Sequence, residues 1–138
     1  MLSTTRRLAA ALPFAALLFA SPLTHAAEPI YTPEPIVVPA GKSQEAVRQA
    51  IRKALFSKNF EIKEVGGGHI EGKYTKSGRK GARHVAVITV RYDAKAVKIS
   101  YKDSEDLDYD AKDGTIHKTY NRWVRNVEKS IRASLGSY

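Results

Sequence analysis

Apolar residues are spaced in two different ways along the chain, and each spacing predicts a different kind of element. Between residues 47 and 55 they recur every three or four positions, which is typical of a helix. Ser43 is suited to cap this helix, so we predict a helix from 44 to about 58. From Phe60 onward apolar and polar residues alternate, and this period of two predicts strands.

Four strands are predicted in succession, with short connections between them. They lie near residues 60–63, 70–74, 84–92 and 97–102. The third strand is expected in the centre of the sheet, because its β-branched residues face both sides. A glycine-bearing, mobile hairpin tip is expected at 76–83, and sequential strands with such short connections indicate an antiparallel meander.

The segments before and after the meander are also patterned. Residues 28–39 contain four prolines, which exclude a helix and favour an extended arm, and 36–38 could pair at a sheet edge. Residues 103–113 form an acidic loop, after which Thr115 is placed to cap a final helix with one apolar and one basic side. The apolar stripe holds Tyr120, Trp123, Val124, Val127, Ile131 and Leu135, and the basic stripe holds Lys118, Arg122, Arg125, Lys129 and Arg132.

These elements predict an α+β fold in the order β-α-β-β-β-β-α. Two helices would lie on one face of a four-stranded antiparallel meander, which makes a two-layer sandwich. Residues 27–42 are expected to form the extended proline-rich arm with its short edge strand, and 43–138 a single α+β domain. The chain of 138 residues contains no cysteine, so core packing alone must hold this fold together.

Residues 1–26 have the composition of a secretory signal peptide. Arg6 and Arg7 precede a short apolar run, and 24–26 offers small residues to a signal peptidase, so cleavage is expected after Ala26, with Ala27 as the alternative. An uncleaved anchor is the competing interpretation. We expect a periplasmic or secreted protein. Without the signal the chain keeps 21 basic and 14 acidic residues, a net charge of +7, which favours phospholipid, lipopolysaccharide or acidic wall polymers as partners.

Two segments near the C-terminus resemble a group of small exported proteins and lipoproteins of Gram-negative bacteria. Residues 101–109 have the form Y-x-D-S-x-x-L-x-Y, and residues 116–127 have the form I-H-x-x-Y-N-x-W-V-x-N-V. The resemblance implies an envelope protein and carries no functional residue with it. Members of the group that have a lipobox cysteine are anchored in the membrane, whereas this chain has no cysteine.

Basic residues around the predicted hairpin are the strongest candidate binding residues: Lys73, Lys76, Arg79, Lys80 and Arg83. A flexible cationic tip suits an anionic surface, so we expect it to bind a lipid head group, lipopolysaccharide, a wall polymer or a protein partner. No nucleic acid is expected, because apart from Tyr74 the basic stretches lack aromatic residues for base stacking. The competing interpretation is that these residues only keep the protein soluble.

Ser104, Tyr109, His117 and Asn121 form a second candidate site, a cleft at the start of the final helix. In an enzyme of hydrolase type His117 would be the base and Ser104 the nucleophile. No activating motif surrounds Ser104, so we favour a non-enzymatic protein in which Tyr120 and Trp123 anchor the core and His117 or Asn121 binds the backbone of the preceding loop.

No metal or cofactor is expected. Asp106, Asp108 and Asp110 alternate like the start of a calcium loop, but Ala111 stands where the turn needs glycine. The histidines beyond the signal, His69, His84 and His117, do not have zinc-ligand spacing.

A third class of function is structural. Val85, Val87 and Thr89 would make the helix-free face of the sheet apolar enough to pair two subunits as a homodimer.

Overall fold

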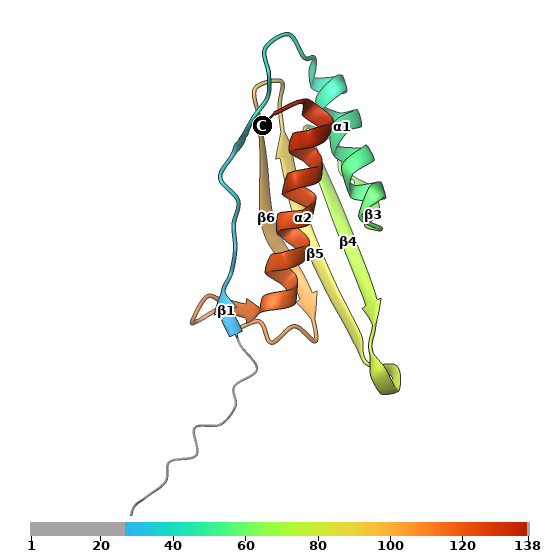
Figure 1. The fold of residues 1–138 in the computed structure, drawn as a ribbon, viewed down its shortest axis with the longest axis vertical. Coiled ribbons are helices and arrows are strands. Elements are labelled where there is room, and N and C mark those ends of the chain that lie inside the picture. Colours follow the sequence, from blue (N-terminus) through green and yellow to red (C-terminus); the bar gives the residue numbers. More distant parts are fainter. Residues whose placement is uncertain (1–26, 138) are drawn as a thin grey trace, which may run out of the picture.

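The computed structural model describes residues 27–137, which form a sheet with both helices on one side (Figure 1). The signal peptide predicted for 1–26 lies outside these described residues. The elements in chain order are β1 (Ala27–Pro29), β2 (Ile36–Val37), α1 (Gln44–Ser57), β3 (Glu61–Glu64), β4 (His69–Ser77), the 3-10 turn η1 (Arg79–Gly81), β5 (Arg83–Tyr92), β6 (Ala96–Glu105), β7 (Thr115–His117) and α2 (Lys118–Leu135).

Five strands form one antiparallel sheet in the order β2-β6-β5-β4-β3. β3 to β6 are the predicted meander, and β5 occupies its predicted central place. β2 pairs with β6 through Ile36 opposite Val97, so the arm supplies the predicted edge strand. β1 and β7 form a separate antiparallel pair, which the sequence did not predict because each strand has only three residues.

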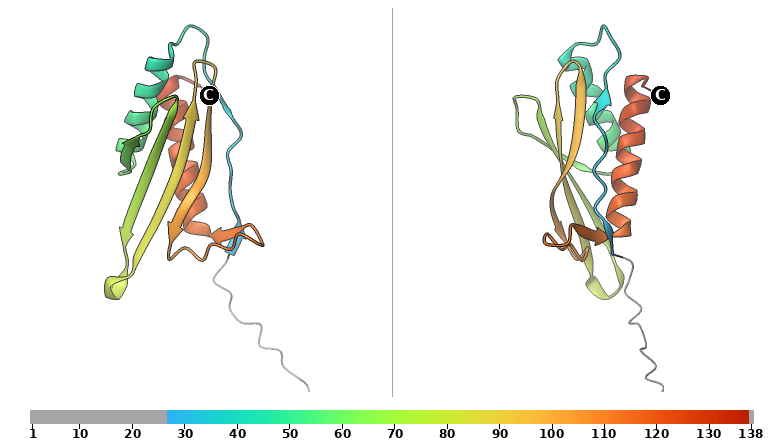
Figure 2. Two further views of the ribbon diagram at one scale, coloured as in Figure 1. Left: turned by 180° about the vertical axis from the view of Figure 1, so that it is seen from behind. Right: turned by 90° about the vertical axis from the view of Figure 1, so that its left-hand side faces the viewer.

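The two helices lie side by side on one face of the sheet, so the predicted α+β two-layer sandwich is confirmed (Figure 2). Ser43 caps α1 as predicted, and its side-chain oxygen accepts a hydrogen bond from the amide of Ala46 at 3.1 Å. The apolar stripe of α2 is buried: Trp123 is 9% exposed, and Tyr120 is fully buried. Burial of this stripe against the sheet is the main source of the packing free energy that α2 supplies.

Gly72 in β4 allows α1 to approach the sheet closely. A Cβ atom at this position would lie 3.1 Å from Leu55 Cδ2 and 3.1 Å from Phe60 Cδ1. The absence of a side chain therefore makes room for the aromatic ring and for the last turn of the helix.

The prediction that Thr115 caps the final helix is wrong. Thr115 pairs with Pro29 in the β1–β7 ladder, which holds its backbone extended, and α2 begins only at Lys118. His117 is the cap instead, and its Nδ1 accepts a hydrogen bond from the amide of Thr119 at 3.1 Å. The helix therefore starts later than its polar pattern indicates.

Beyond the start of α2, β4 and β5 continue as a projecting hairpin with η1 at its tip (Figure 1; Figure 2). The helices do not cover this part of the sheet. The loop between β6 and β7 lies at the same end of the molecule, and the hairpin extends past it.

Candidate functional site

The tip of the projecting hairpin is closed by its own backbone. The amide of Gly78 donates to the carbonyl of Ala82 at 2.6 Å, and the amide of Ala82 donates to the carbonyl of Arg79 at 3.2 Å. Lys80 has a φ of 56°, in the left-handed region that a tight tip requires. This turn holds Arg79 and Lys80 exposed at the end of the hairpin, and Arg83 is exposed at the start of β5.

The basic residues of the hairpin form no ion pair with any acidic side chain of residues 27–137. Within residues 27–137 every ion pair uses other basic side chains: Arg48, Arg52, Lys63, His69, Lys102 and Arg132. Unpaired charges at an exposed tip keep their full attraction for an external anion, because no internal contact has to be broken first.

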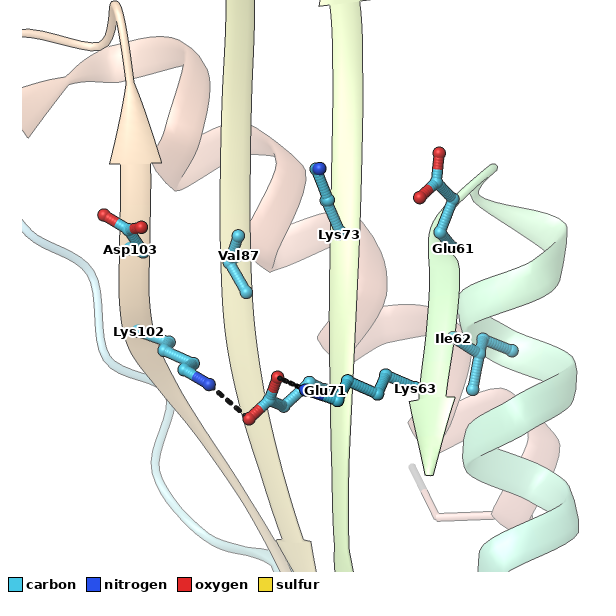
Figure 3. A pocket seen from close by; sticks show the side chains of 8 residues that line it. All are labelled: Glu61, Ile62, Lys63, Glu71, Lys73, Val87, Lys102 and Asp103. Atoms are coloured by element: carbon cyan, nitrogen blue, oxygen red, sulfur yellow. Dashed lines mark hydrogen bonds and ion pairs between the residues drawn. The ribbon is translucent and has the colours of Figure 1, made fainter. Parts of the chain in front are cut away.

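Lys73 is separated from the rest of the predicted set. Tyr74 packs against Trp123 at a ring separation of 4.6 Å, so Tyr74 and Lys76 lie on the helix side of β4. Lys73 points to the opposite, helix-free face, where it lines a cavity together with acidic residues (Figure 3). The cationic end of the hairpin is therefore formed by Lys76, Arg79, Lys80 and Arg83, which we call the cationic tip.

The cavity on the helix-free face has a volume of about 370 Å³, and Glu71 lines it between Lys102 and Lys63 (Figure 3). The Nζ atom of Lys102 donates a hydrogen bond to Glu71, and Lys63 Nζ lies 3.9 Å from the same carboxylate. The hydrogen bond from Lys102 holds the pKa of the Glu71 carboxyl below its ordinary value, and the charge of Lys63 adds to the effect. The carboxylate of Glu71 is therefore neutralised by Lys102 and Lys63.

A bulge in β6 brings Lys102 to this carboxylate. Tyr101 pairs with Ile88 and Asp103 pairs with Val87, so Lys102 is the extra residue between them. Charged side chains thus surround Val87 on the face that the homodimer hypothesis needs to be apolar. The homodimer stays a prediction, and this face does not favour it.

A second cavity, of about 280 Å³, lies on the helix side between the projecting hairpin and the start of α2. We call it the hairpin cavity. It is lined by Lys76, Gly78, His84, Leu107, His117, Thr119 and Trp123. These residues come from β4, the hairpin turn, β5, the loop after β6, β7 and α2, so only the folded chain brings them together. No carboxylate is among them.

The four residues of the predicted cleft do not converge. The hydroxyl of Ser104 is hydrogen-bonded to that of Tyr101 at 2.8 Å, and Tyr109 stacks on the same Tyr101 ring at 4.2 Å. His117 caps α2 and lines the hairpin cavity. This arrangement contains no hydrogen bond between Ser104 and His117, which a nucleophile and its base would make.

Asn121, the fourth residue, connects the N-terminal arm to α2 by hydrogen bonds. It is 1% exposed, its Oδ1 accepts from the amide of Tyr31 at 2.8 Å, and its Nδ2 donates to the carbonyl of Pro29 at 2.9 Å. It therefore binds backbone as predicted, but the backbone belongs to the arm and not to the preceding loop. Arg125, one turn later, lies 4.3 Å over the ring of Tyr31 and adds a cation–π contact.

Residues 27–137 contain no group of three His, Asp or Glu side chains that could hold an ion. Asp110, from the calcium-like sequence, accepts hydrogen bonds from the amides of Lys112 and Asp113 at 2.9 and 3.1 Å and so stabilises a turn. In the same part of the chain no helix is long and apolar enough to cross a membrane.

Fold and surface define a small α+β protein with a cationic hairpin and a carboxylate-free cavity behind it. The sequence matches no protein-family model, and comparison with curated proteins found no relative. The assignment of function therefore depends on the chemistry of this end of the molecule.

Proposed function

We propose that the protein is a non-enzymatic, exported envelope protein that binds an anionic surface component through the cationic tip. The observation that carries the proposal is the projection of a hairpin whose Arg79, Lys80 and Arg83 are exposed and unpaired with any acidic group of residues 27–137. Phosphate-bearing lipids and lipopolysaccharide are the anions that an exported protein meets most directly.

The position of the tip supports contact with a flat surface. The acidic loop between β6 and β7 lies at the same end of the molecule, but the hairpin extends past it (Figure 1; Figure 2). A surface that touches the tip is therefore held away from the like-charged carboxylates, which would otherwise repel it.

The expected binding is reversible. Each lysine or arginine close to an anionic membrane contributes about 1 kcal/mol, so the four residues of the cationic tip contribute about 4 kcal/mol. That free energy corresponds to a dissociation constant of about 1 mM, which favours transient adsorption unless further contacts form. Because the charges are exposed, adsorption should weaken as salt shortens the Debye length from about 10 Å at 0.1 M.

Adsorption to vesicles tests the proposal. A variant with Lys76, Arg79, Lys80 and Arg83 all changed to Gln is compared with the wild type by co-sedimentation with vesicles that contain phosphatidylglycerol. The matched control changes Lys53, Lys95, Lys98 and Lys129 to Gln, four exposed residues elsewhere with the same total charge.

We expect salt-sensitive adsorption of the wild type and the control variant, and loss of adsorption in the tip variant. Unchanged adsorption of the tip variant would show that the hairpin is not the binding element. Equal loss of adsorption in the control would show that net charge and not the hairpin is responsible.

A further inference from the structure

We propose that the hairpin cavity binds a phosphate monoester, the group that a sugar phosphate or a terminal lipid phosphate presents. The inference rests on the proposed function, because it names the chemical group that the cationic end of the molecule would take up. It concerns a defined cavity behind the tip and can be tested without any surface.

The charge of the cavity favours an anion. Lys76 lines it from β4 and makes no ion pair to any acidic residue of the described part, and none of the lining residues is a carboxylate. The cavity on the opposite face of the sheet differs in this respect, because Glu61, Glu71 and Asp103 line it. A negative group entering the hairpin cavity therefore meets ammonium and imidazole groups with no competing internal anion.

His117 lines this cavity, and its Nε2 makes no hydrogen bond within residues 27–137. Its Nδ1 accepts the amide hydrogen of Thr119 at 3.1 Å, and an amide can only donate. The neutral ring therefore carries its proton on Nε2, which remains available to donate to a bound oxygen.

His84 has the opposite arrangement. Its Nδ1 lies 2.8 Å from the carbonyl oxygen of Asp106, and a carbonyl can only accept, so Nδ1 carries the proton and Nε2 has the free lone pair. Nε2 lies beside Gly78, where a Cβ atom would come within 3.1 Å of it. The glycine therefore leaves room for the ring at the wall of the cavity.

This combination of donors and acceptor suits a phosphate monoester better than a carboxylate. A phosphate offers three terminal oxygens, enough to accept from Lys76, His117 and the hydroxyl of Thr119 together, whereas a carboxylate offers two. Its second ionisation lies near pH 6, so a bound phosphate can carry a P–OH group that donates to the free lone pair of His84 Nε2.

The apolar side of the cavity would contact the group that carries the phosphate. Leu107 is 2% exposed and Trp123 is 9% exposed, and both side chains line the cavity. Asp106 and Asp108 both have positive φ values, 58° and 52°, which turn the loop so that Leu107 between them is buried. The acidic side chains on either side of this leucine do not line the cavity.

Trp123 allows the proposal to be tested directly, because it is the single tryptophan of the chain. Its fluorescence is followed while glycerol 3-phosphate is added, with glycerol and glucuronate as neutral and carboxylate controls. Imidazole NMR signals of His84 and His117 are followed in the same titration. Lys76→Gln tests the cationic wall, and Lys95→Gln, an exposed substitution at the far end of the sheet, is its matched control.

We expect saturable changes at Trp123 and both histidines with glycerol 3-phosphate. Loss of a charge-assisted hydrogen bond should weaken binding about ten-fold or more in Lys76→Gln and leave Lys95→Gln unchanged. Absence of a histidine response, equal binding of glucuronate, or equal affinity of Lys76→Gln would overturn the assignment.

Binding to vesicles distinguishes a lipid phosphate from a soluble phosphate ester as the ligand. Phosphatidic acid, a lipid monoester, is compared with phosphatidylglycerol, a diester, at equal surface charge. Preference for phosphatidic acid together with a Trp123 response indicates a lipid ligand, whereas a response only to soluble esters indicates a sugar or glycerol phosphate, and both support the site.

A tip variant that retains Lys76, with Arg79, Lys80 and Arg83 changed to Gln, distinguishes this inference from the proposed function. Its vesicle adsorption tests the surface role, while its titration with glycerol 3-phosphate tests the cavity alone.

Discussion

The contact between the arm and α2 makes a quantitative prediction about Asn121. Asn121 is 1% exposed, and its side chain makes two well-formed hydrogen bonds to the arm: Oδ1 accepts from the backbone amide of Tyr31 at 2.8 Å, and Nδ2 donates to the carbonyl of Pro29 at 2.9 Å. A third contact, to Glu28 Oε2, is longer at 3.3 Å. Asn121→Ala removes all three and leaves the amide of Tyr31 without its partner.

The expected loss can be estimated from these contacts. Two hydrogen bonds contribute about 1 kcal/mol each, and the stranded amide of Tyr31 costs about a further 1 kcal/mol. Alanine has a higher helix propensity than asparagine by about 0.6 kcal/mol, which offsets part of the loss. We therefore expect Asn121→Ala to lower the free energy of unfolding by about 2 kcal/mol.

Asn126 provides a control on the same helix, because it is exposed and its side chain makes no hydrogen bond within residues 27–137. Asn126→Ala should raise stability slightly through helix propensity alone. Urea unfolding followed by far-UV circular dichroism measures both variants. If Asn121→Ala loses less than about 1 kcal/mol, or matches Asn126→Ala, the arm is not held by this side chain and the reasoning fails.

Three further predictions concern the core and the sheet. Tyr120→Phe should raise the free energy of unfolding by about 1 kcal/mol, because the buried hydroxyl has no hydrogen-bond partner in the described residues; a loss in urea unfolding would contradict this. Gly72→Ala should cost about 1–3 kcal/mol, because its methyl group would crowd Leu55 and Phe60, and a neutral result in the same assay would show that the helix can shift. The lowered pKa of Glu71 means that its ion pairs stabilise the fold above the ordinary carboxyl pKa of about 4.5 and lose this effect as the pH falls through the lower folded value. The stability difference between wild type and Glu71→Gln should therefore shrink on acidification, and a constant difference from neutral to acid pH would refute it.

Sequence periodicity was sufficient for most of the fold. The three- and four-residue spacing of apolar positions located both helices, and the alternation of apolar and polar residues located the meander, because both patterns follow directly from the geometry of the elements. β1 and β7 could not be found in this way, since a pair of three-residue strands contains too few positions to show a period. The same pair displaced the start of α2 from the Thr115 cap that local chemistry favours.

The candidate site was predicted less completely. The basic residues of the hairpin can be read from the sequence. Lys73 and Lys76 are three residues apart in β4 and so lie on opposite faces of the sheet. This difference can be inferred from the alternation of side chains once the strand is known. The hairpin cavity cannot be predicted from the strand register alone. His84, Leu107 and His117 lie far apart in the chain, and no spacing relates them before the hairpin and α2 are placed together.

The cavity and the exposed tip have one structural origin, the late start of α2. At about 1.5 Å per residue its 18 residues span about 27 Å, close to the length of β5, whose 10 residues at about 3.3 Å each span about 33 Å. The helix could therefore cover most of the hairpin if it began at that end. Pairing of β1 with β7 prevents this, because residues up to His117 are held extended. A helix capped at Thr115 would begin two residues, or about 3 Å, earlier, at the end where His117 and Thr119 line the hairpin cavity. The N-terminal arm thus stabilises α2 through Asn121 and, by fixing where α2 begins, leaves the cationic end of the sheet uncovered by the helix.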